Sequence, residues 1–217
     1  MEASVFAVEK IIGYTFQNKK LLEHALTHTS YPEAVSYEHL EYVGDAVLGL
    51  AISSHLFLTY SSVDSDTLSL LRAANVSTEK LARAAVRHGL HSYVRHNMVS
   101  IGDEIKAFVD AIGCENDCAG SAKAPKILAD IMKSIVAAIF IDVNLDLKRL
   151  WVIIKGLLEP MVTLDDLEQN PQSVKMLYEI CQKNGKKVDG ELVASASSDQ
   201  KDITRLEAAK AALDKLP

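Results

Sequence analysis

Hydrophobic residues recur every three to four positions along most of the chain, which is the spacing of one face of an α-helix. Strand-like alternation of apolar and polar residues occurs only near residues 191–196. The pattern therefore predicts a mainly helical protein. The expected helices span residues 5–14, 19–27, 38–58, 67–88, 105–111, 126–143 and 147–159.

Two polar breaks interrupt this pattern and predict how the chain is organised. Residues 113–125 mix glycine, acids and proline between two apolar runs, which is typical of an exposed loop. Residues 165–171 are polar and end at Pro171, which disfavours helix at the residue before it. We therefore predict a domain over residues 1–164, a linker over 165–171 and a smaller unit over 172–217.

The composition is that of a well-packed protein, because 48% of the 217 residues are hydrophobic and 24% are charged, with few glycines and prolines. The longest wholly apolar run considered as a membrane span, residues 135–141, is too short to cross a bilayer. The first residues also lack the pattern of a secretory signal. We therefore expect no membrane partner and an intracellular location, with nothing to distinguish nucleus, cytoplasm and organelle.

The cysteines, Cys114, Cys118 and Cys181, are odd in number and scattered along the chain. The first two lie in a predicted loop with no histidine or third cysteine close in sequence. This spacing favours free thiols over a zinc site.

The net charge of −6 argues against nucleic-acid binding, because phosphate contacts normally require a basic surface. Of the 29 acidic and 23 basic residues, 22 and 15 lie at or before Pro171. The acidity therefore belongs to the larger unit, where bound divalent cations could offset part of it.

One predicted helix carries a group of acids in the segment HLEYVGDAVLGL, residues 39–50. Glu41 and Asp45 are four residues apart and so share a helix face. Gly44 lies between them, although glycine is a poor helix former, which indicates that another backbone comes close there. Glu38 lies in the first turn, where a negative charge suits the helix dipole.

A second helix, KILADIMKSIVAAIFID at residues 126–142, is apolar nearly all round and is therefore expected to be buried. Asp130 in that setting is costly to bury as an ion unless it is paired or binds a metal.

These acids could also have purely structural roles. Glu41 and Asp45 alone could form a solvated helix face, and Asp130 could be a hydrogen-bonded or ion-paired carboxylate. Three acids on two otherwise apolar helices favour instead a site for Mg²⁺ or Mn²⁺, which prefer carboxylate oxygens.

These motifs resemble the ribonuclease III family. HLEYVGDAVL is similar to its signature ERLEFLGDSVL, and residues 126–142 are similar to its partner helix KILADxxEAxxGAIYLD. The segment LLRAANVSTEKLARAAVRHGL, residues 70–90, is similar to LRxxLVxxxxLAxxAxxLGL. The resemblance spans roughly residues 5–160 and is strongest toward the small plant ribonuclease III-like proteins.

The resemblance implies an all-α domain that dimerises through its signature helix and binds double-stranded RNA, each subunit hydrolysing one strand with divalent metal. It assigns metal-ligand roles to Glu41, Asp45 and Asp130, with Asp45 also catalytic. Glu38 takes an accessory acidic position near the subunit interface.

Two positions depart from the family pattern. The fourth family ligand, a glutamate, is replaced by Lys133, and a further glutamate of many bacterial members is replaced by Ser65. An ammonium group near divalent cations repels them by several kcal/mol at an effective dielectric constant of ~20. We therefore predict impaired cleavage with retained RNA binding. Two alternatives are that Lys133 extends away while one metal supports slow cleavage, or that it holds the acids together without metal.

The C-terminal residues resemble a truncated α/β double-stranded RNA-binding domain. Residues 170–185 are similar to its first helix and residues 188–216 to its last strand and closing helix, whereas the first two strands are missing. Lys201 and Arg205 are its candidate RNA contacts, and acids flank both, so we expect them to bind weakly. The alternative is an ordinary helical tail.

The sequence leaves three functional hypotheses. The leading one is a homodimeric protein that binds double-stranded RNA and cleaves it poorly because of Lys133. The second is an active endonuclease that processes double-stranded RNA. The third is a scaffold that forms a heterodimer with an active family member.

Overall fold

The computed structural model describes residues 2–32, 34–113 and 123–169 of the chain. The chain divides into two units, Met1–Met161 and Val162–Pro217, and each is described by itself. The described part of the first unit contains α1 (Glu2–Ile12), α2 (Lys19–Ala25), α3 (Glu38–Thr59), α4 (Ser65–Asn75), α5 (Thr78–Arg87), the 3₁₀-helix η1 (Leu90–Tyr93), α6 (Val99–Gly113), α7 (Lys126–Asp142) and α8 (Leu147–Leu158). The described part of the second unit contains α9 (Leu164–Gln169).

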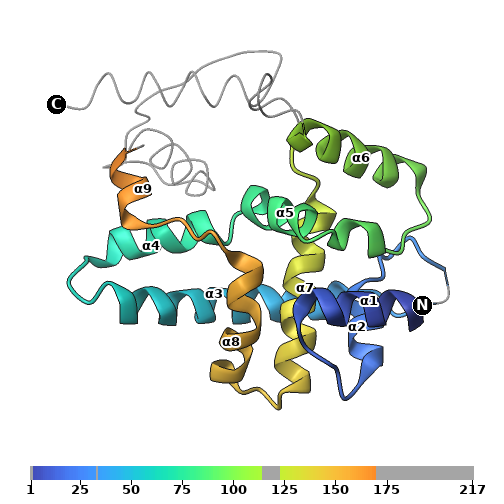
Figure 1. Cartoon of the computed structure of the whole chain (residues 1–217), viewed down its shortest axis with the longest axis horizontal. Coiled ribbons are helices and arrows are strands. Elements are labelled where there is room, and N and C mark those ends of the chain that lie inside the picture. Colours follow the sequence, from blue (N-terminus) through green and yellow to red (C-terminus); the bar gives the residue numbers. More distant parts are fainter. Residues whose placement is uncertain (1, 33, 114–122, 170–217) are drawn as a thin grey trace, which may run out of the picture. The chain divides into compact units, whose positions relative to one another are not determined.

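Helix α7 is the centre of the first unit, as its nearly continuous apolar sequence predicts. It packs against α2, α3, α5 and α8, and it stands in the middle of the unit with α3 running across it (Figure 1). Every side chain of α7 from Ile127 to Ile139 is buried except that of Lys133. The predicted all-α nuclease-type domain is confirmed for the described residues of this unit, which contain no β-strand.

Helices α3 and α7 approach closely because Gly44 has no side chain. A Cβ atom at residue 44 would lie 1.9 Å from the carbonyl oxygen of Lys133 and 2.5 Å from its carbonyl carbon. The expectation that another backbone comes close to Gly44 is therefore confirmed. The contact places Lys133 of α7 directly over the acidic turn of α3.

The C-terminal end of α7 is held by hydrogen bonds to Asp142. This buried carboxylate accepts the hydroxyl of Tyr14 at 2.7 Å and the backbone N–H groups of Gln17 and Asn18 at 2.8 and 2.9 Å. Burial acts to raise the pKa of Asp142, but these three bonds outweigh it and lower the pKa. Burial and the same bond raise the pKa of Tyr14 to about 12. Asp142 thus fastens the connection between α1 and α2 to the core.

The single helix expected over residues 67–88 is wrong, because the structure contains two helices there. Helix α4 ends at Asn75, and Ser77 takes an extended conformation as the N-cap of α5, where its hydroxyl accepts the N–H of Lys80. Serine competes well for backbone N–H groups at a helix start, and this capping bond interrupts the apolar periodicity.

Other elements differ in extent from the sequence prediction. Helix α6 begins at Val99 rather than near residue 105, because Val99 and Ile101 are two residues apart and Gly102 follows them, a pattern that carries no helical periodicity. Helix α9 forms within the segment expected to be a polar linker. The predicted strand, the truncated RNA-binding module and the three cysteines lie outside the described residues.

Helix α3 is also long and apolar enough, by length and composition, to cross a membrane. A third of its apolar window is buried inside the first unit, and a core helix of a soluble protein meets the same criteria. Several of its large apolar side chains, among them Tyr42, Leu50 and Phe57, are exposed.

Candidate acid centre between α3 and α7

The predicted acids lie on facing turns of the two central helices. Glu41 and Asp45 share one face of α3, and Asp130 lies on the first half of α7. Their exposure differs: the side chain of Asp45 is 63% exposed and that of Glu41 27%, whereas that of Asp130 is 6% exposed. The two α3 acids can therefore meet a ligand from solvent, while Asp130 must be satisfied mainly from within.

Lys133 occupies the space between the two helices at this centre. Its ammonium nitrogen is 2.7 Å from Oδ1 of Asp45 and 3.8 Å from Oε1 of Glu41, and its side chain is only 17% exposed. The lysine therefore does not extend away into solvent. It forms ion pairs with the two carboxylates to which the family resemblance assigns metal-ligand roles.

Asp130 has its own pair of partners. Its Oδ2 lies 2.7 Å from the ammonium group of Lys126, one turn earlier on α7, and accepts a long hydrogen bond of 3.4 Å from the hydroxyl of Tyr37. The hydrogen bond to Asp130 raises the pKa of Lys126 above its ordinary value, and the charge of Glu41 adds to this effect. The structure therefore agrees with the structural interpretation of Asp130 as an ion-paired carboxylate.

Tyr37 links the acids electrostatically. Burial raises the pKa of its hydroxyl, and the charges of Asp130, Glu41 and Glu38 raise it further. Glu38 itself is exposed in the first turn of α3, and no ion pair of Glu38 occurs among the described residues. Glu38, Glu41 and Asp130 therefore act on one locality. Lys133 joins Asp45 to Glu41, and Lys126 is the counter-ion of Asp130.

A divalent cation does not fit the acids as they are arranged. Within residues 2–32, 34–113 and 123–169, no group of three or more Asp, Glu, His or Cys side chains is close enough to hold a metal ion. Lys133 is ion-paired with Glu41 and Asp45, and Lys126 is ion-paired with Asp130. A cation would have to displace at least one ammonium group before it could bind two of these carboxylates.

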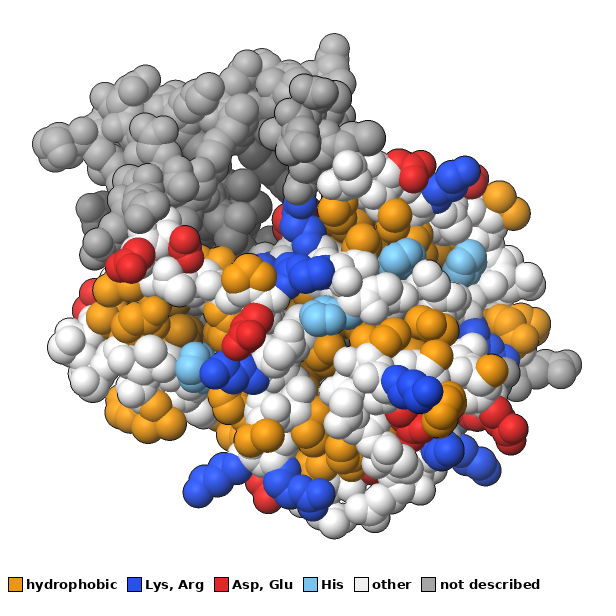
Figure 2. Space-filling model, viewed as in Figure 1, with side chains coloured by type: hydrophobic (Ala, Val, Ile, Leu, Met, Phe, Trp, Pro, Cys, Tyr) orange, Lys and Arg blue, Asp and Glu red, His pale blue; other side chains and the backbone are white. Residues whose placement is uncertain are grey.

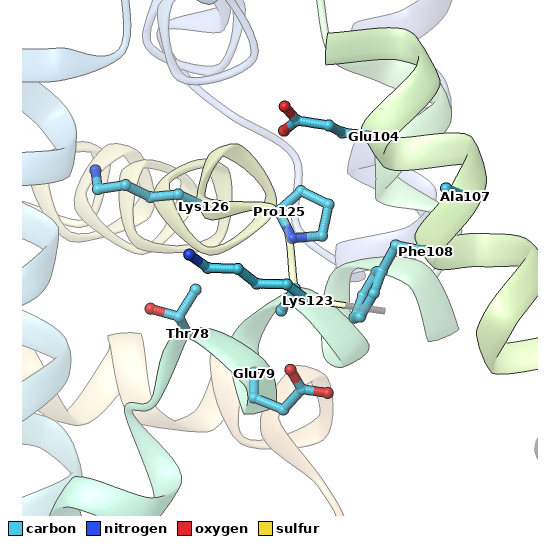
Figure 3. Close-up of a pocket in the computed structure, with 9 residues that line it drawn as sticks. Thr78, Glu79, Glu104, Ala107, Phe108, Lys123, Pro125 and Lys126 are labelled. Atoms are coloured by element: carbon cyan, nitrogen blue, oxygen red, sulfur yellow. The ribbon is translucent and has the colours of Figure 1, made fainter. Parts of the chain in front are cut away.

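A hollow of about 780 Å³ opens beside the N-terminal end of α7. It is lined by residues of α5, α6 and the segment entering α7: Thr78, Glu79, Glu104, Ala107, Phe108, Lys123, Ala124, Pro125 and Lys126. Figure 3 shows the side chains of Lys123 and Lys126 extending in the same direction. Lys126 thus belongs both to this hollow and to the acid centre.

Sequence reasoning missed two members of the centre. Lys126 could have been found, since it precedes Asp130 by four residues, the spacing of helical ion pairs. Tyr37 carried no signal, because only the packing of the loop before α3 brings it to Asp130. Ser65 is the first residue of α4, and Lys201 and Arg205 lie outside the described residues.

Fold and site together define an all-α domain with an acidic centre between its two central helices. The Ribonuclease III domain family matches residues 38–144, which include α3, α7 and every acid of the centre. The chain is 51% identical over 234 residues to Ribonuclease 3-like protein 2 of Arabidopsis thaliana, covering 98% of this chain and 60% of that protein. It is 43% identical over 235 residues to Ribonuclease 3-like protein 2 of Oryza sativa, covering 96% of this chain and 74% of that protein. The chain therefore belongs to the ribonuclease III family, as the motifs predicted.

The solved structures include the nuclease domain of ribonuclease III from Campylobacter jejuni, studied for flexibility in the region involved in dimer formation. Its TM-score to this chain is 0.57 at 29% sequence identity, with 70% of this chain and 94% of that chain covered. Because the chain spans only 60% of the length of the Arabidopsis relative, the activity and partners of the whole protein are matters for proposal.

Proposed function

We propose that this chain is a dimeric, double-stranded RNA-binding member of the family that hydrolyses RNA poorly. The observation that carries the proposal is the position of the Lys133 ammonium group, 2.7 Å from Asp45 and 3.8 Å from Glu41. The lysine brings positive charge to the position where the family pattern has an oxygen ligand. Mg²⁺ or Mn²⁺ should therefore bind weakly.

The expected cost to catalysis follows from transition-state arithmetic. Loss of only ~4 kcal/mol of transition-state stabilisation slows a reaction about a thousandfold. Repulsion of one cation and loss of one carboxylate ligand are together large enough to supply that amount.

Dimerisation is supported by an apolar face on α3. Tyr42, Leu50 and Phe57 lie at helical spacing and are 80%, 55% and 67% exposed. Large exposed apolar side chains on one helix face are typical of a protein interface. A second copy of the chain is the proposed occupant, and an active family member that offers the same face is the alternative.

The cleavage test compares the native chain with Lys133→Glu on long duplex RNA, in Mg²⁺ and separately in Mn²⁺. We expect Lys133→Glu to cleave at least ~100-fold faster than the native chain. The matched control is Lys133→Glu combined with Asp45→Ala, which should lose the gained activity. Cleavage by the native chain at the rate of Lys133→Glu would contradict the proposal and favour an active endonuclease.

The dimer test is sedimentation or size-exclusion of the native chain and of Phe57→Glu. The native chain should migrate as a dimer and the variant as a monomer, because a charge in an apolar interface is costly to desolvate. Val152→Glu is the control, since Val152 is an equally apolar side chain, 79% exposed, on α8 rather than on α3. A native monomer that pairs only with an active family member would support the scaffold alternative.

A further inference from the structure

Two loops beside the acid centre are joined through their backbones. Thr27 and Arg95 form a parallel β-bridge, in which the N–H of His28 donates to the carbonyl of Arg95 at 2.8 Å. The N–H of Arg95 in turn donates to the carbonyl of Leu26 at 2.8 Å. Farther along, the N–H of Asn97 donates to the hydroxyl of Ser30 at 3.0 Å. These bonds make residues 26–31 and 94–97 one structure, here called the joined loops.

The joined loops carry Arg95, whose guanidinium N–H groups have no hydrogen-bond acceptor among the described residues. The guanidinium carbon of Arg95 lies 4.0 Å from the centroid of the Tyr31 ring, a cation–π contact that fixes the position of the group. Among the described residues, no carboxylate lies within ion-pair distance of Arg95, and its guanidinium donates no hydrogen bond. By contrast, Lys126 and Lys133 are both paired with acids.

The joined loops border the acid centre directly. The rings of His28 and Tyr37 lie 5.7 Å apart, and the hydroxyl of Tyr37 reaches Asp130. The electrostatic environment agrees with this proximity: burial and the charge of His96 lower the pKa of His28, and the charges of Glu38 and Asp130 act in the opposite direction. The backbone of Arg95 is therefore linked to Asp130 through a hydrogen bond from His28, the ring contact of His28 with Tyr37, and the hydroxyl of Tyr37.

The acid centre has a net negative charge, so RNA binding there requires a cation nearby. Among residues 2–32, 34–113 and 123–169, two ammonium groups pair with Glu41, Asp45 and Asp130 and none pairs with Glu38, so two of the four negative charges remain to repel an RNA backbone. Lysine and arginine side chains are scattered, not gathered, on the face of the first unit in Figure 2. A single unpaired cation on the joined loops should therefore matter more here than in a protein with a broad basic surface.

We propose that Arg95, held by Tyr31, binds a phosphate group of the RNA strand that lies along the acid centre. The inference rests on the proposed function and names one of its contacts. A guanidinium group matches the geometry of a phosphate by donating two parallel N–H bonds. Tyr31 is a positioning residue, since it fixes the guanidinium without contacting the phosphate.

The test measures equilibrium binding of the full chain to a defined duplex RNA in EDTA, over a series of KCl concentrations. Arg95→Ala should lower affinity about tenfold and flatten the slope of log affinity against log salt by about 1 per subunit. Arg95→Lys should keep the salt slope but lose part of the affinity for RNA. Lysine retains the positive charge but lacks the two parallel N–H donors of the guanidinium group. Arg72→Ala, which removes the same charge from an exposed position on α4, should change neither quantity.

The outcomes separate this inference from the function on which it rests. If Arg95→Ala and Arg72→Ala behave alike while the native chain binds RNA, the Arg95 contact is wrong and the proposed function stands. If the native chain has no affinity for the duplex, both are wrong. The loops are joined by backbone atoms, so these variants should keep the native circular dichroism spectrum and melting temperature. Were Arg95→Ala to unfold, equal affinity of Arg95→Lys and the native chain would still overturn the contact.

Discussion

The two buried aspartates of α7 stand near opposite ends of the same helix and are satisfied in different ways. Asp142 accepts three hydrogen bonds of 2.7–2.9 Å from a hydroxyl and two backbone N–H groups. Asp130 accepts one long bond from Tyr37 and the ammonium group of Lys126, a side chain that is 79% exposed. Burial of a carboxylate therefore does not by itself mark a chemical site. Asp142, which accepts hydrogen bonds from neutral groups of the folded chain, serves as a structural anchor. Asp130, whose counter-ion is a lysine that faces solvent, could exchange that partner for another cation.

Removing the anchor should give the largest loss of stability. Asp142→Ala leaves two backbone N–H groups and a tyrosine hydroxyl without their acceptor, and we expect the free energy of unfolding to fall by about 4 kcal/mol. Urea denaturation measures it. Asp146→Ala, which removes only the exposed N-cap of α8, should cost about 1 kcal/mol. Equal losses in the two variants would show that Asp142 is no more than another cap.

The middle of α7 is held by backbone packing against α3, which Gly44→Ala tests. A Cβ atom 1.9 Å from the carbonyl of Lys133 must push α3 and α7 apart, at a cost of about 3 kcal/mol. Gly156→Ala is the matched control, because nothing lies within 4 Å of a Cβ at that position of α8. The control should raise the stability by about 0.5–1 kcal/mol through helix propensity alone. A neutral Gly44→Ala would mean that the two helices are not tightly fixed.

Neutralising Asp130 should cost much less than removing Asp142. Asp130→Asn keeps an acceptor for Tyr37 and releases Lys126 into solvent, so the free energy of unfolding should change by no more than about 1 kcal/mol. Parallel urea titrations of Asp130→Asn and Asp142→Asn give the comparison. If Asp130→Asn is the more damaging of the two, the distinction between anchor and exchangeable group is wrong.

The smallest expected effect is a difference in acid sensitivity. The pKa of Asp142 is lowered in the folded chain, so its contribution to stability is present above the unfolded value of about 3.9 and is lost as pH falls through the folded value. Below about pH 4 the native chain should therefore lose stability more steeply than Asp142→Asn. Thermal unfolding followed from pH 6 downward measures both slopes, and parallel curves would exclude Asp142 as a source of acid sensitivity.

The sequence predicted the elements whose signal lies in apolar periodicity and the acids whose signal lies in a motif. Helix α7, the close approach at Gly44 and the position of residue 133 beside Glu41 and Asp45 belong to this class, whereas the metal-ligand roles of the acids stay a prediction. The division between α4 and α5 was missed because one serine hydroxyl overrides a continuous pattern. Tyr37 and Arg95 could not be predicted, since their places depend on loops that pack through backbone bonds.

The close contact at Gly44 also bears on how readily the chain could change its chemistry in evolution. The backbone at residue 133 is positioned by the packing of two helices, so the side chain there can be exchanged without moving its support. Lysine and glutamate codons differ only in their first base. A single nucleotide transition would therefore place the family's acid on a backbone already in position, and the same step in reverse would remove it again.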